Sequence, residues 1–148
     1  MWTAASVLAC ALSVLGRGEA SMPRIELIDV APPYVSDGAE AFVQRDTIYL
    51  MTSSSAFRTA LESRVGCSAS WAMQKLASIL AHEAWHVRHG PDEKSAYEHQ
   101  LITLIQLGVQ PGSGVYRSVQ VSMLRVLEAR KRNKPDKPER LLAGLAFF

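Results

Sequence analysis

The chain has 148 residues, of which 48% are apolar and 20% are charged, a balance typical of a single globular domain with its own core. The formal net charge of +2 is too small to indicate nucleic acid as the main partner. Cys10 and Cys67 are the only cysteines, so the chain has neither a thiolate zinc knuckle nor a Cys-x-x-Cys redox motif.

Residues 2–15 are uncharged and mostly apolar, but a bilayer span needs about 20 such residues. The length suits the core of a signal peptide, and residues 18–20 offer small side chains at the positions that a signal peptidase recognises. We therefore predict a cleaved leader over residues 1–20 and a secreted, periplasmic or cell-envelope location. The alternative is a buried N-terminal helix. Cleavage would leave Cys67 as the only thiol, without an internal disulfide.

The segment after the leader has the pattern of a small sheet. Residues 24–30 alternate polar and apolar side chains, which predicts a half-buried strand. Residues 39–43 and 46–51 form a second strand-like region around a polar turn. We expect the segment 46–51 to offer an edge that pairs with an extended substrate, to pack Ile48 and Leu50 on the helices as an interior strand, or to do both.

The rest of the chain is predicted to be helical. A short helix is expected over residues 56–65, followed by longer ones over 70–89, 91–108 and 115–129. The fold class is therefore α+β, with a small N-terminal β-sheet followed by a helical layer. We assign residues 21–129 to one domain. Residues 130–148 are expected to be a basic linker, with six Lys or Arg up to residue 140, and a short apolar tail.

Residues 82–86 read His-Glu-Ala-Trp-His. In a helix, positions i and i+4 lie on the same face, so His82 and His86 can both bind one zinc ion at about 2.0–2.1 Å. Glu83 would lie near the metal without binding it, where it can take a proton from a zinc-bound water and pass it to the leaving amine. The helix around the motif is nearly all apolar, and three polar side chains would be costly there without a partner.

The motif resembles that of the zincin metallopeptidases, a likeness that covers roughly residues 79–100. The resemblance implies that His82 and His86 are zinc ligands and that Glu83 is the general base and acid. Residues 93–97 look like the glutamate helix of the gluzincin branch, which implies that Glu93 is the third ligand. Tyr97 differs from that pattern, since the branch often has Asp or Asn there to support the first histidine. A tyrosine hydroxyl could substitute, or could help to hold the reacting carbonyl oxygen.

Two other carboxylates are alternatives for the third ligand. Asp92 has the spacing of a metzincin-like site, and Glu98 is expected near the apolar face of the following helix. His89 is seven residues from His82, an axial rise of about 10 Å, so one ion cannot bind both. We expect His89 to interact with the helix dipole instead.

These features together predict a zinc-dependent peptidase that acts on a peptide or protein substrate. Its cofactor would be Zn2+, held by His82, His86 and Glu93, and Glu83 would carry the proton. The alternative is a non-catalytic zinc-binding module or pseudo-enzyme used for partner recognition. A third possibility is a helical domain whose basic tail touches anionic membranes. We expect no nucleic-acid partner and no stable membrane insertion after leader removal.

Overall fold

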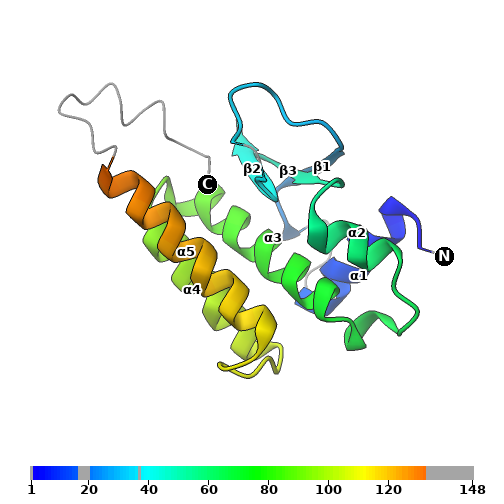
Figure 1. The fold of residues 1–148 in the computed structure, drawn as a ribbon. Coiled ribbons are helices and arrows are strands. Elements are labelled where there is room, and N and C mark those ends of the chain that lie inside the picture. Colours follow the sequence, from blue (N-terminus) through cyan, green and yellow to red (C-terminus); the bar gives the residue numbers. More distant parts are fainter. Residues whose placement is uncertain (1, 17–20, 37, 133–148) are drawn as a thin grey trace.

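The structure is a computed structural model and describes residues 2–16, 21–36 and 38–132. It confirms the α+β class, with a three-stranded sheet and a layer of helices (Figure 1). In chain order the elements are α1 (Ala4–Leu15), β1 (Arg24–Ile28), β2 (Ala41–Gln44), β3 (Thr47–Met51), α2 (Ser55–Leu61), the 3-10 helix η2 (Cys67–Ala69), α3 (Trp71–His89), α4 (Glu93–Gln106) and α5 (Gly114–Arg132).

The sheet has the order β1-β3-β2, in which β3 runs parallel to β1 and antiparallel to β2. A two-residue turn joins β2 to β3, and both of its residues, Arg45 and Asp46, have positive φ angles of 50° and 62°, as in a type I′ hairpin. Because β3 lies between two partners, it offers no free edge, and the prediction of an edge strand there is wrong. Ile48 and Leu50 are fully buried, which confirms the interior alternative.

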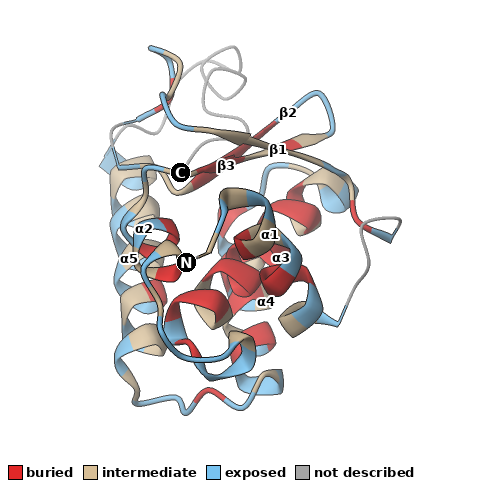
Figure 2. Ribbon diagram, turned by 90° about the vertical axis from the view of Figure 1, so that its right-hand side faces the viewer, coloured by how far each residue is buried: buried red, intermediate tan, exposed pale blue. Residues whose placement is uncertain are grey.

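Helix α3 is the central element of the fold. Ser70 caps its first turn by accepting a hydrogen bond from the backbone N–H of Met73. The helix packs against α1, α2, α4 and the sheet, and Figure 2 shows it as the most continuously buried helix. Such a position explains why its sequence is apolar on almost every side.

Helix α1 packs on α3 and is part of the main core. Thr3 begins it with a capping box and Gly16 ends it in the left-handed conformation. Its buried Cys10 forms a disulfide with Cys67 in η2. The buried N-terminal helix that we weighed as the alternative is thus the arrangement of the intact chain, while cleavage after residue 20 stays a prediction. No helix among the described residues is both long and apolar enough to cross a membrane.

The remaining helices differ from the expected bounds by a few residues. Helix α2 ends at Leu61, and α4 starts at Glu93 with Asp92 as its N-cap, after Pro91 instead of at it. Helix α5 packs on α4 and continues to Arg132, so its last turn occupies the first part of the predicted linker. The rest of the predicted linker and the apolar tail, residues 133–148, lie outside the described residues.

Candidate metal centre

The last turns of α3 place the predicted site residues in the interior. His82 and Glu83 are fully buried and His86 is 7% exposed. Glu93 is 3% exposed and opens α4, which packs back against α3. The short connection after Gly90 therefore returns a carboxylate to the two imidazoles.

His82, His86 and Glu93 point their potential ligand atoms at one another. Nε2 of His82 lies 3.2 Å from Nε2 of His86 and 3.2 Å from Oε1 of Glu93. The same carboxylate oxygen also contacts Nε2 of His86. All three ligand atoms lie within 4.8 Å of one another, so the group could hold a metal ion.

Gly90 orients His86. It has a φ of 103° and a ψ of −161°, a conformation that is open essentially to glycine alone. The glycine ends α3, and its carbonyl oxygen accepts a 2.8 Å hydrogen bond from Nδ1 of His86. Because a carbonyl only accepts, the proton of a neutral His86 lies on Nδ1. The lone pair of Nε2 then faces the cluster, as a metal ligand requires.

Gln100 contacts the other ring nitrogen of His82. Its Oε1 lies 2.8 Å from Nδ1, and the side chain is 4% exposed. Tyr97 instead packs its ring edge-on against His82, with ring centroids 4.4 Å apart. Sequence reasoning left the support of His82 open, with the Tyr97 hydroxyl as one option, and missed Gln100. The available signal was spacing, since Gln100 lies two helical turns after Glu93, on the same face of α4.

Glu83 is the least satisfied side chain of the site. Neither of its carboxylate oxygens has a hydrogen-bond partner among the described residues. Burial, followed by the nearby charge of Glu93, raises the pKa of Glu83 well above its usual 4.5. This carboxyl group therefore holds its proton to a higher pH than an ordinary glutamate.

Two other groups of the site shift in the opposite direction. Burial lowers the pKa of His82 below its usual 6.5, although its interaction with Glu93 partly opposes this change. Burial would raise the pKa of Glu93, but its close contacts and charge interactions with His82 and His86 outweigh burial and lower it. A neutral imidazole therefore lies beside an ionised carboxylate.

The donor set fits a metal cation. The lone pair of His86 and the charge of Glu93 face the same small volume, and the buried Oε2 of Glu93 has no hydrogen-bond partner among the described side chains. The nearest cationic contact is Nη2 of Arg130, 4.0 Å from that oxygen, on a residue predicted to lie in a solvated linker. Two imidazole nitrogens and one carboxylate oxygen match the three protein ligands of catalytic zinc sites, which leave a fourth position open.

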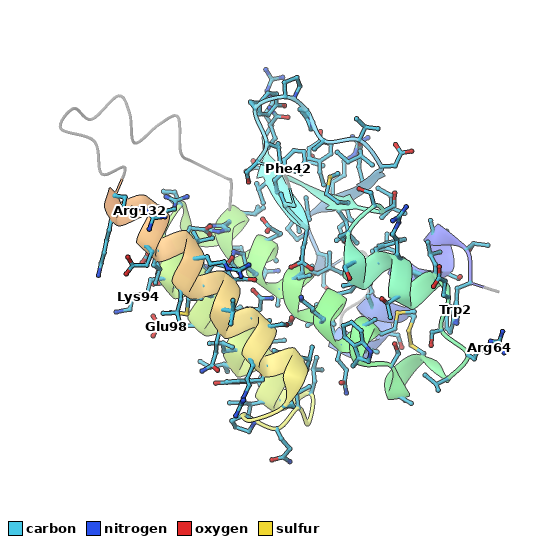
Figure 3. All side chains as sticks on the ribbon, viewed as in Figure 1. Trp2, Phe42, Arg64, Lys94, Glu98 and Arg132 are labelled. Atoms are coloured by element: carbon cyan, nitrogen blue, oxygen red, sulfur yellow. A yellow bond between two sulfur atoms is a disulfide. The ribbon has the colours of Figure 1, made fainter. Side chains whose placement is uncertain are left out.

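The rejected ligand candidates all lie on the surface. Asp92 is exposed and accepts a 2.6 Å hydrogen bond from Ser95. Glu98 is exposed and lies near Lys94 on α4 (Figure 3). Ile102 and Ile105, which follow it on the same face of the helix, are 52% and 49% exposed, so the apolar face expected beside Glu98 is not the buried one. His89 is also exposed, and its ring stacks on Trp85 with centroids 4.8 Å apart.

Comparison with known proteins finds no relative for this chain: no protein-family model, no curated protein and no solved structure matches it. The zincin resemblance therefore rests on residues 82–86, on Glu93 and on the geometry that brings them together. The family assignment stays a prediction.

Proposed function

We propose that this protein is a zinc-dependent peptidase of a minimal gluzincin-like type. His82, His86 and Glu93 would hold the zinc ion, and Glu83 would act as general base and acid in the hydrolysis of a peptide bond. The proposal is carried by one observation, the complete burial of the Glu83 carboxyl group without a hydrogen-bond partner among the described residues. Such a group costs stability, and a zinc site that only stabilised the fold would have no use for it.

The environment of Glu83 suits proton transfer at neutral pH. Zinc, when bound, supplies a Lewis acid that lowers the pKa of water and polarises the substrate carbonyl. A general base works best when its pKa is near the working pH, and burial moves the pKa of Glu83 upward, in that direction. Glu83 would accept the proton of the attacking water and deliver it to the leaving amine. His82 and His86 would remain neutral ligands.

An extracytoplasmic location is the second part of the proposal. The disulfide between Cys10 and Cys67 supports it, because disulfides persist in oxidising compartments and are rare in the cytosol. The same disulfide links α1 to the domain, so a molecule that is cleaved after residue 20 would lack it. N-terminal sequencing of protein from the native host distinguishes the two forms.

A non-catalytic zinc module is the second candidate, and the burial of the site favours it. His82 and Glu83 are fully buried and Glu93 is 3% exposed, so a substrate would need a local opening to reach them. In such a module the zinc ion would hold α3 to α4 and would have no exchangeable water. Water exchange at a paramagnetic substitute such as Co2+, measured by relaxation, separates this candidate from the peptidase.

The test of the peptidase uses the full chain and the Glu83→Gln variant, which keeps the size of the side chain. We expect about one zinc per chain in both proteins by elemental analysis, and cleavage of a mixed peptide library by the wild type only. Glu98→Gln is the matched control, because Glu98 is an exposed glutamate on α4, and it should cleave normally. Cleavage that survives in Glu83→Gln would refute the proposed role of this residue.

A further inference from the structure

Ser78 lies on α3 one turn before His82 and is fully buried. Its hydroxyl group donates a 2.7 Å hydrogen bond to the backbone carbonyl oxygen of Lys75. A hydroxyl has one proton, and a carbonyl oxygen has none to share. The proton of Ser78 is therefore committed to Lys75, and Ser78 can only accept from any other neighbour.

That neighbour is Gln100. Its Nε2 donates a 3.1 Å hydrogen bond to Oγ of Ser78, which fixes the orientation of the side-chain amide. With the nitrogen facing Ser78, the amide oxygen faces His82, 2.8 Å from Nδ1. An amide oxygen only accepts, so Gln100 favours the imidazole proton on Nδ1. Oε1 of Glu93 lies 3.2 Å from Nε2 and favours a proton there while no metal ion is bound. With a metal ion in that place, Nδ1 would keep the proton and Nε2 would offer its lone pair.

We propose that Ser78 and Gln100 are positioning residues of the metal centre, which together keep the proton of His82 on Nδ1. The inference rests on the proposed metal site, because a bound ion would take the place of a proton between Nε2 and Glu93. A turned amide would present its NH2 group to Nδ1 and move the imidazole proton to Nε2. That proton would point at Glu93 and His86 and prevent His82 from binding a metal ion.

The two histidines thus reach the same tautomer by different means. A backbone carbonyl, that of Gly90, holds His86, and no side-chain substitution removes it. His82 depends on two side chains, of which Ser78 does not touch the imidazole. A substitution at Ser78 can therefore affect the imidazole of His82 without touching it.

The experiment measures zinc affinity by chelator competition, and the protonated nitrogen of His82 by 15N NMR on the zinc-loaded full chain at pH 8. In the wild type we expect the proton of His82 on Nδ1. In Ser78→Ala we expect a zinc affinity about 10-fold lower, within the range for lost outer-shell partners. Alanine is the best helix former, so α3 should be retained, which circular dichroism checks.

Two further variants make the result specific. Ser118→Ala removes the same kind of bond, since Ser118 donates to the carbonyl three residues earlier at 2.8 Å on α5, and both readouts should stay unchanged. In the double variant Ser78→Ala with Gln100→Glu, a carboxyl group replaces the amide and offers His82 oxygen atoms only. We expect this double variant to restore the zinc affinity.

An unchanged zinc affinity in Ser78→Ala would overturn the inference, and so would a double variant that binds zinc as weakly as Ser78→Ala. A wild-type chain that binds zinc but cleaves no peptide, combined with weaker zinc binding in Ser78→Ala, would refute the proposed function and leave the positioning role intact. The two proposals can therefore fail separately.

Discussion

The two sides of α3 bury different kinds of side chain. One side packs apolar residues against α1, α2 and the sheet, in a core that includes Phe57, Leu76 and Leu80, all fully buried. The side toward α4 buries polar groups instead, which are Ser78, His82, Glu83, His86, Glu93, Gln100 and Thr103. Burial of apolar surface stabilises the first side. The second side buries carboxylate oxygens that have no hydrogen-bond partner within the described part of the chain. The comparison shows one helix that serves both as a core element and as the base of a site.

The largest expected effect concerns the polar side and its proposed metal. Glu93→Ala removes the only carboxylate of the His-His-Glu group, so we expect zinc affinity to fall more than about 100-fold, beyond the usual cost of an outer-shell partner. Glu98→Ala, at an exposed position on the same helix, should bind zinc like the wild type. Chelator competition measures both, and equal affinities would exclude Glu93 as a ligand.

The second prediction addresses the apolar side. Replacement of Cys10 and Cys67 by alanine opens a link between positions 57 residues apart, and we expect the free energy of unfolding to fall by about 2–4 kcal/mol. Urea denaturation measures this loss. Zinc affinity of the folded protein should not change, because neither cysteine touches the polar side. A weakened zinc site would show that the two sides of α3 are coupled.

The third prediction tests whether Glu83 costs stability. Leucine is apolar and similar in size, so Glu83→Leu should raise the free energy of unfolding of the metal-free protein by about 1–4 kcal/mol. The pKa of Glu83 in the fold lies above its usual 4.5, so the folded wild type binds this proton more tightly than the unfolded chain. Wild-type stability should therefore fall relative to the variant as the pH rises above about 4.5.

Urea denaturation of both proteins across this pH range supplies the measurement. The difference in the free energy of unfolding should be smallest in acid, where the carboxyl group of Glu83 is protonated in both states. A difference that is independent of pH would mean that the charge of Glu83 is not the source of the cost.

The smallest effect is expected at Gly90. A Cβ at this position meets no atom within 4 Å, so Gly90→Ala acts through backbone conformation alone, with a cost of about 1–3 kcal/mol for the positive φ. A shift of the Gly90 carbonyl would also loosen His86 and lower zinc affinity. Gly112→Ala, at a glycine without a positive φ, is the control. Equal thermal unfolding of the two variants would argue against the strain at Gly90.

Much of the fold could be predicted from local patterns. The strand and helix segments were expected close to their observed places, because alternation and helical periodicity are local properties of the chain. The apolar N-terminal segment was ambiguous, since a signal peptide and a buried helix share the same composition. The partner that distinguishes them in the structure is Cys67, 57 residues away.

The sequence by itself determined His82, Glu83 and His86 as a group, because helical spacing places i and i+4 on one face wherever the helix lies. It also favoured Glu93 but left Asp92 and Glu98 open. Only the tertiary structure decided among them, because the angle at which α4 returns on α3 sets which side of α4 is buried. The same packing brought Gln100 to His82 and Arg130 to Glu93. Contacts between separate helices depend on that packing, and no local pattern encodes them.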